Sequence, residues 1–128
     1  MSESRHPHSE RRLRLGLERL GLDVELTAPL MRYLAELEKW NATYNLTAVR
    51  DPAEMLTHHL LDSLAVIAPL RQQVAQHGWS GVRMLDVGSG GGLPGVVLAI
   101  CIPELNVSCV DTVAKKAAFV QQVAVSLK

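Results

Sequence analysis

A glycine-rich turn between a short apolar segment and a helical segment constrains this chain more than any other feature. Residues 82–87 (VRMLDV) are mostly apolar and lie between Gly81 and Gly88, as a buried strand of a parallel sheet would. Glycine fills four of the next five positions, namely Gly88, Gly90, Gly91 and Gly92. Glycine loses more backbone entropy on folding than other residues, so a simple connection does not need four of them. The turn therefore indicates a place where the backbone comes close to a ligand.

The residues after the turn repeat the strand and helix pattern. Residues 94–100 predict a helix that Pro103 stops, and residues 107–111 predict a second buried strand. Residues 114–127 predict a second helix, with one apolar face formed by Ala117, Val120, Val123, Ala124 and Leu127. This order predicts parallel strands with crossover helices, hence an α/β doubly wound sheet. Such a sheet normally has about six strands, so we expect the chain to be truncated after its second strand and helix.

The residues before the turn predict helices only. A helix over 9–20 has an apolar stripe of Leu13, Leu17 and Leu20, widened by Leu15, and Gly21 stands at its C-cap. A second helix follows Thr27, a candidate N-cap, and its apolar face comprises Leu30, Tyr33, Leu34, Leu37 and Trp40.

Two further helix starts follow. Asp51-Pro52-Ala53-Glu54 predicts a helix from Pro52 to near Leu60, and Asp62-Ser63 offers another cap. Pro69 leaves open whether one helix or two comes next. We therefore divide the chain into a disordered lead-in (1–8), an N-terminal helical block (9–80) and the first half of a doubly wound domain (81–128).

Composition restricts the class of protein. Lys and Arg together number 13, as do Asp and Glu, so the chain has no overall basic charge that would indicate a nucleic-acid partner. The local excess of arginine over residues 1–20 is the exception. Cys101 and Cys109 are the only cysteines, which fits a reduced intracellular protein. Because neither a signal peptide nor an apolar run of about 20 residues is present, we expect a cytoplasmic protein that does not span a membrane.

The glycine-rich turn fits two cofactor patterns. Gly90, Gly92 and Gly95 match the dinucleotide fingerprint, and Asp111 lies near the position of its ribose-binding acid. In the other register, Gly88, Gly90 and Gly92 follow Asp86, as in Rossmann-like methyltransferases.

The charge of the ligand favours the second pattern. A pyrophosphate needs bare N–H groups and no nearby carboxylate, so Asp86 would repel it. S-adenosylmethionine carries a sulfonium and an ammonium, and an acid under the turn helps to organise its site. We therefore predict an S-adenosylmethionine site at Asp86, Gly88, Ser89, Gly90, Gly92, Leu93, Asp111 and Thr112. Asp111 has two interpretations, as a partner of the ribose hydroxyls and as the N-cap of the following helix.

Three segments together resemble one family, the ribosomal small-subunit RNA guanine-N7 methyltransferases, formerly called glucose-inhibited division protein B. They are residues 39–51 (KWNATYNLTAVRD), 59–64 (HLLDSL) and 85–95 (LDVGSGGGLPG). Val110-Asp111-Thr112, with Lys115, Lys116 and Phe119, is similar to the family's next motif. The resemblance extends from about residue 10 to the last residue. It implies a class I Rossmann-like fold behind an N-terminal helical block.

The resemblance also implies an activity: methyl transfer from S-adenosylmethionine to N7 of one guanine in 16S ribosomal RNA. It places Gly88 and Leu93 against the methyl donor and Asp111 and Thr112 near its adenosine part. Guanine N7 has an in-plane lone pair and no proton, so it attacks without a general base, and catalysis is mainly positioning. Members of the family continue past residue 128, so we expect this chain to be incomplete for activity. We expect the full-length protein to be a monomer.

The RNA-facing residues are open to two interpretations. Arg11, Arg12 and Arg50 are candidates for phosphate contacts, and a solvated helix face explains the arginines of the first helix equally well. Asn41 and Asn45 either shape the substrate side of the cleft or make local turn bonds. His59 and Asp62 are explained better by a structural hydrogen bond than by catalysis.

Two other functions remain alternatives. A nicotinamide-dependent oxidoreductase would use the Gly90-Gly92-Gly95 register, and a fragment without catalytic activity would serve as an interaction module.

Overall fold

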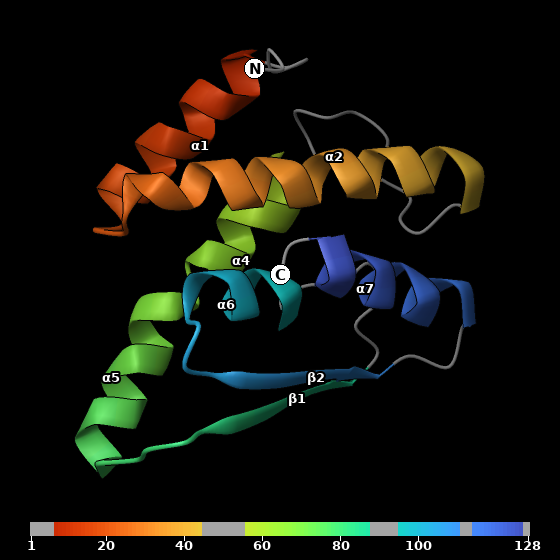
Figure 1. The fold of residues 1–128 in the computed structure, drawn as a ribbon. Helices are drawn as coiled ribbons and strands as arrows, with labels where there is room; N and C mark the ends of the chain where they lie inside the picture. Colours follow the sequence, from red (N-terminus) through yellow and green to blue (C-terminus); the bar gives the residue numbers. More distant parts are fainter. Residues whose placement is uncertain (1–6, 45–55, 88–94, 111–113, 127–128) are drawn as a thin grey trace.

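The computed structural model describes residues 7–44, 56–87, 95–110 and 114–126. Within these ranges the helices are α1 (Pro7–Arg19), η1 (Val24–Leu26), α2 (Thr27–Tyr44), η2 (Leu56–Leu61), α4 (Asp62–Leu64), α5 (Ile67–His77), α6 (Gly95–Cys101) and α7 (Ala114–Ser126). The strands are β1 (Arg83–Val87) and β2 (Asn106–Val110). Figure 1 shows α1 and α2 above α6 and α7, which in turn cover one face of the sheet.

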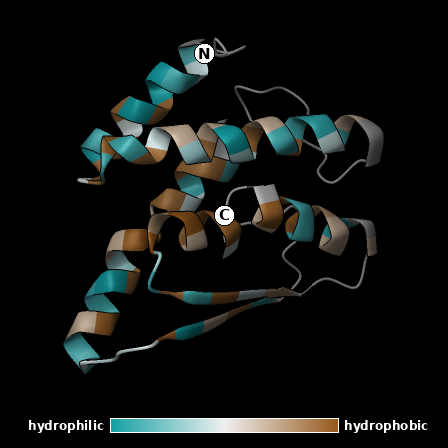
Figure 2. Cartoon of the chain, viewed as in Figure 1, coloured by the Kyte–Doolittle hydropathy of each residue, from teal (hydrophilic) through white to brown (hydrophobic). Residues whose placement is uncertain are grey.

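The two strands are parallel, as the strand–helix–strand order predicts. Arg83 pairs with Asn106 at one end of the sheet, and Val87 pairs with Val110 at the other. Helix α6 connects the strands and is apolar on all sides, as Figure 2 shows by its almost uniformly brown ribbon. A helix of this kind must be buried, and its residues Val96, Val97, Leu98 and Cys101 are. The expected mixed α/β architecture is confirmed.

The sheet is buried on one face only, which corrects the expectation of fully buried strands. The side chains that face α6 and α7 are half-buried, namely Met84, Asp86, Val107 and Cys109. The alternate positions are exposed, and Leu85 keeps 61% of its surface in water. The cause is that both helices following the strands lie on the same side of the sheet (Figure 1).

Helix α1 ends as predicted, but its buried stripe is narrower than expected. Leu13 and Leu17 are fully buried, whereas Leu20 and Leu15 are exposed. The N–H of Leu22 donates to the carbonyl of Leu17 at 2.8 Å, with Gly21 in the left-handed region at φ 71°. This is the glycine-dependent helix end that the sequence predicts. Leu20 follows the last helical residue, Arg19, and lies next to this reversal.

Thr27 is not the N-cap of α2. It is already helical, and its hydroxyl donates to the carbonyl of Val24 at 2.6 Å. The capping side chain is Asp23, whose Oδ1 accepts from the N–H of Glu25 at 2.9 Å and so begins η1. The predicted apolar face of α2 is confirmed, since Leu30, Tyr33, Leu34 and Leu37 are buried and Trp40 packs against the core.

The segment before the sheet departs from the predicted helices. Residues 56–61 form a π-helix that runs directly into α4, so Asp62 has no helix start to cap and is exposed. Asp51 lies outside the described residues. The question raised by Pro69 is answered by two helices, α4 and α5, with a turn between them. Pro69 is tolerated because it lies in the first turn of α5, where N–H groups have no helical partner.

Helix α7 joins the helical block to the sheet through an aromatic cluster. Its buried residues are Phe119 and Val123, whereas Ala117 and Ala124, expected on the buried face, are exposed. The ring of Phe119 lies 5.6 Å from that of Trp40 and 6.3 Å from that of Tyr33, measured between centroids. The large Phe119 side chain therefore sets which face of α7 turns inward, which the smaller residues did not indicate.

Candidate functional site

The frame of the candidate site lies where both strands end. Residues 88–94 connect β1 to α6, and residues 111–113 connect β2 to α7, so both connections leave the same edge of the sheet. Ligands of open α/β sheets bind at this edge. Gly88, Ser89, Gly90, Gly92, Leu93, Asp111 and Thr112, which the sequence predicts as cofactor residues, fall within these connections and lie outside the described residues. The structure does describe the residues on either side of these connections.

Asp86 holds the start of α6. Its Oδ2 accepts a hydrogen bond from the backbone N–H of Gly95 at 3.0 Å. The first N–H groups of a helix have no helical partner and carry partial positive charge, so a carboxylate satisfies them well. The bond joins the residues on either side of the glycine-rich turn. Asp86 therefore fixes the distance between the two ends of that turn.

Gly95 allows α6 to lie directly against the strands. A Cβ at this position would come within 2.7 Å of Cys109 Sγ and 2.8 Å of Asp86 Oδ2. Real Cβ atoms do not make such contacts, so no other residue fits without a shift. Cys109 is the register partner of Asp86 in the sheet. Sequence reasoning gave Gly95 a role only in the dinucleotide pattern, where the third glycine permits this same packing.

Tyr33 of α2 belongs to the same cluster and was predicted only as a core residue. Its side chain is fully buried. Burial raises the pKa of the phenol well above its ordinary value, and the nearby Cys109 and Asp86 raise this pKa further. The ring of Tyr33 also lies 6.3 Å from that of Phe119 in α7, measured between centroids. The N-terminal helical block therefore shares its hydrophobic core with the sheet and its helices through Tyr33.

The candidate RNA-facing residues are spread over the helical block. Arg11 and Arg12 are exposed on α1, as are Arg14 and Arg19, and the four are spread around the exposed part of that helix. Asn41 lies on α2 and is only 2% exposed, which places it in the interior and not on an RNA-facing surface. Asn45 and Arg50 lie outside the described residues. The exposed surface of α1, with its four arginines, is thus the surface to test.

An apolar pocket of about 490 Å³ lies between α6, β2 and α7. It is lined by Gly95, Val96, Ile100, Val107, Cys109 and Val120, among others. Gly95 and Cys109 belong both to this pocket and to the frame described above. Across the ranges that the structure describes, no group of three or more His, Cys, Asp or Glu side chains gathers as metal ligands would.

Comparisons with known proteins identify the family. The family model described as GidB, rRNA small subunit methyltransferase G, matches residues 27–128. A curated protein named ribosomal RNA small subunit methyltransferase G, from Acidovorax sp. (strain JS42), is 64% identical over 125 residues. The alignment covers 92% of this chain and 55% of that relative. The chain belongs to this family.

Two further relatives carry the same name. The protein from Paracidovorax citrulli (strain AAC00-1) is 63% identical over 126 residues, covering 91% of this chain and 52% of the relative. The protein from Albidiferax ferrireducens is 61% identical over 128 residues, covering 93% and 57%. The chain thus spans about half the length of the curated relatives that it matches.

The family match covers the whole frame of the candidate site. Tyr33, Asp86, Gly95 and Cys109 all fall within residues 27–128, whereas α1 with its arginines precedes them. Among the helices that the structure describes, none has both the length and the apolar character to cross a membrane.

Proposed function

We propose that this chain forms the front part of a methyltransferase that transfers a methyl group from S-adenosylmethionine to N7 of one guanine in 16S ribosomal RNA. The observation that carries the proposal is the Asp86–Gly95 hydrogen bond across the glycine-rich turn, in a chain of this family. The relatives are named as methyltransferases of small-subunit ribosomal RNA. The choice of guanine N7 rests on the resemblance described above.

The fold that we propose is the class I Rossmann-like methyltransferase fold. Two parallel strands, with α6 and α7 on one side, match the first half of such a sheet. In this proposal residues 81–128 contribute that half and residues 9–80 form a separate helical block. Helix α1 begins at Pro7, so the end of the predicted disordered lead-in (1–8) belongs to that block. Phe119 packed against Trp40 supports a close union between the block and the sheet.

The charge around Asp86 fits a methyl donor better than a dinucleotide. The N–H of Gly95, which a pyrophosphate would need, already donates to a carboxylate. A negative side chain beneath the turn suits a ligand with a sulfonium and an ammonium. We therefore assign the donor to Gly88, Ser89, Gly90, Gly92 and Leu93 of the turn and to Asp111 and Thr112 after β2, with Asp86 as the residue that holds the turn.

The proposed chemistry requires positioning more than proton transfer. When bound, S-adenosylmethionine supplies an electrophilic methyl group. The N7 lone pair of guanine is unprotonated at neutral pH and attacks in line, so no side chain has to remove a proton. The task of this chain is then to hold donor and base at the correct distance and angle, which is a large part of many rate enhancements. Asp86 and Gly95 serve this task by holding the two ends of the turn together.

Binding measurements test the cofactor. We expect calorimetric titration to detect S-adenosylmethionine and not NAD. Asp111→Ala should weaken donor binding, whereas Asp62→Ala, which removes an exposed acid of α4, should leave it unchanged. A chain that binds NAD and not S-adenosylmethionine is the oxidoreductase alternative, and one that binds neither is the interaction module.

The transferred group tests the reaction. Small ribosomal subunits that lack the modification are incubated with radiolabelled methyl donor and a full-length protein that contains this chain. The RNA is then treated with borohydride and aniline. N7-methylguanine carries a fixed positive charge that makes its ring reducible, so cleavage of the RNA at the labelled guanine is expected. Label at any other atom would contradict the assignment to N7.

A further inference from the structure

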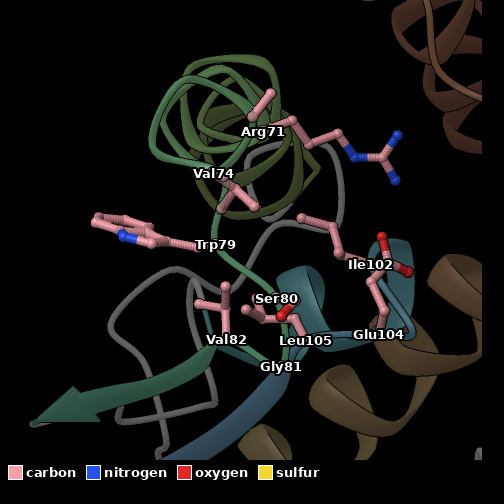
Figure 3. A pocket seen from close by; sticks show the side chains of 11 residues that line it. Arg71, Val74, Trp79, Ser80, Gly81, Val82, Ile102, Glu104 and Leu105 are labelled. Atoms are coloured by element: carbon pink, nitrogen blue, oxygen red, sulfur yellow. The ribbon is translucent and has the colours of Figure 1, made fainter.

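A second pocket, of about 420 Å³, lies at the opposite end of the sheet from the glycine-rich turn. It is bounded by the second half of α5, the loop at 78–82 and the segment that leads from α6 into β2. Figure 3 shows Val74 of α5 on one side and Ser80, Gly81 and Val82 on the other. The volume falls within the range of small-molecule sites, about 300 to 1,000 Å³. None of the residues assigned to the donor or to RNA lines it.

The loop beside this pocket is built around Trp79. The N–H of Trp79 donates to the carbonyl of Val74 at 3.1 Å, and that of Gly78 donates to the carbonyl of Ala75 at 3.2 Å. This pair of bonds is the Schellman ending of α5, with Gly78 in the left-handed region at φ 63°. Gly81 adopts a similar φ of 59°. Two left-handed glycines thus define the backbone on both sides of Trp79 and Ser80.

The indole of Trp79 is held in place but not covered. Its ring stacks on that of His77, with centroids 4.4 Å apart and planes at 18°. His77 is itself fixed, because its Nδ1 lies 2.9 Å from the carbonyl of Gln73 and must donate to it. Even so, Trp79 keeps 53% of its surface in water. The hydrophobic contact that usually accompanies a Schellman motif does not require so large an exposed ring.

Two charged side chains line the other side of the pocket. Arg71 donates from its guanidinium to the carbonyl of Cys101, at the end of α6, at 3.4 Å. Figure 3 shows Glu104 on the same side as this guanidinium and Trp79 on the opposite side. The pocket therefore presents an aromatic ring, a cation and a carboxylate, all at the surface.

We propose that this pocket binds one unpaired nucleotide of a single-stranded RNA segment. The base stacks on Trp79, the phosphate contacts Arg71, and Glu104 accepts a hydrogen bond from a ribose hydroxyl. Each pairing is a common one: aromatic rings stack on unpaired bases, guanidinium groups bind phosphates, and the 2′-hydroxyl distinguishes RNA from DNA. The proposal rests on the proposed function, because an enzyme of this kind must hold a large RNA beyond the guanine that it modifies.

The combination favours a nucleotide over a peptide. A peptide docks through an open sheet edge or a long apolar groove. This pocket is short, has Ser80 and Gly81 in its lining, and carries charges of both signs on the side opposite a single flat ring. The pocket lies at the end of the sheet where the strands begin, which also suits an accessory contact. The carboxyl ends of the strands then remain available to the methyl donor and the target base.

Tryptophan fluorescence tests the stacking directly. The chain has two tryptophans, so Trp40→Phe leaves Trp79 as the only reporter. We expect saturable quenching of Trp79 by a single-stranded RNA of about six nucleotides, within known site sizes. A ribonucleoside monophosphate carries the same base, ribose and phosphate, so it should also quench Trp79, at a higher concentration. Absence of quenching by the RNA would overturn the proposal.

Affinity measurements with labelled RNA test the individual residues. Trp79→Leu should weaken binding by about five-fold to a hundred-fold, the usual value of one stacked base, and Trp79→Phe should weaken it less. Glu104→Ala should reduce the preference for RNA over DNA of the same sequence. Val66→Ala, an exposed apolar control between α4 and α5, should change nothing. Unchanged affinity in Trp79→Leu would refute the site.

Two further readouts separate this proposal from the proposed function. Trp79→Leu should bind S-adenosylmethionine as tightly as the unchanged chain. A variant that loses RNA binding and keeps donor binding therefore tests the pocket and not the proposed function. A photo-reactive group attached beside Trp79 should form adducts with RNA in small ribosomal subunits. Adducts with ribosomal proteins alone would mean that the pocket receives a peptide and would contradict the proposal.

Discussion

The carboxylate of Asp86 accepts a hydrogen bond from the backbone N–H of Gly95, nine residues further along the chain. Strand β1 ends at Val87 and α6 begins at Gly95, so this bond closes the glycine-rich segment into a loop with fixed ends. The acid next to the glycines thus has a structural role, whatever it also does for the ligand.

Asp86→Ala should destabilise the chain by about 1 to 3 kcal/mol, because it leaves the partly buried N–H of Gly95 without an acceptor. Asp86→Asn keeps an acceptor oxygen and loses only the charge at the helix start, so it should cost about 0.3 to 1 kcal/mol. Urea unfolding of both variants measures the difference. Equal losses for the two variants would show that charge, not the hydrogen bond, is what matters at this position.

Gly95→Ala should destabilise by about 1 to 3 kcal/mol, the usual effect of excess volume in a packed interior. The new Cβ would meet Cys109 Sγ and Asp86 Oδ2. Because Cys109→Ala removes the sulfur, the double variant should recover part of the loss. A double-mutant cycle measures this recovery as a coupling energy. Strictly additive losses would mean that the clash is relieved in another way, by movement of α6.

The fold was predictable where local sequence and tertiary packing agree. The parallel strands, α6 and the ending of α1 at Gly21 all follow from apolar runs, proline and glycine at expected positions. The predictions failed where tertiary packing, and not local sequence, determines which face of a helix is buried or where a helix begins. In α7, Phe119 is buried and the alanines predicted on the buried face are exposed. The helical backbone continues from η2 into α4, so no helix begins at Asp62 for that residue to cap. Helical periodicity cannot distinguish a π-helix from an α-helix over six residues.

The candidate site was predictable from the sequence only in part. Asp86 was identified from charge, because an acid beside a ligand turn restricts what the turn can bind. The hydrogen bond from Gly95 to Asp86 was not predicted, because a hydrogen bond between two elements depends on how they pack. Tyr33 carried no signal beyond its place in an apolar stripe. The sequence left Asn41 with two interpretations, and its exposure of only 2% follows from the packing of α2, which sequence spacing does not give.

The buried thiol of Cys101 should make the chain less stable in alkali. Burial raises its pKa to about 11, although nearby Arg71 acts in the opposite direction. The folded chain therefore holds a proton that the unfolded chain releases at lower pH, and stability falls as pH rises from about 9 to about 11. Unfolding free energies across this range should show a smaller slope for Cys101→Ala. An identical slope would assign the loss to other groups, such as Tyr33.

The exposed arginines of α1 should give RNA binding a measurable salt dependence. Each phosphate contact to a single strand adds about 0.7 to the slope of log affinity against log salt concentration. If Arg11, Arg14 and Arg19 each contact one phosphate, replacing all three with glutamine should reduce the slope by about 2. Replacing the same three with lysine keeps the charge and should keep the slope. Fluorescence anisotropy with labelled RNA at several salt concentrations measures both variants. A glutamine variant with an unchanged slope would show that α1 is only a solvated helix face, and the phosphate contacts would then have to come from elsewhere in the chain.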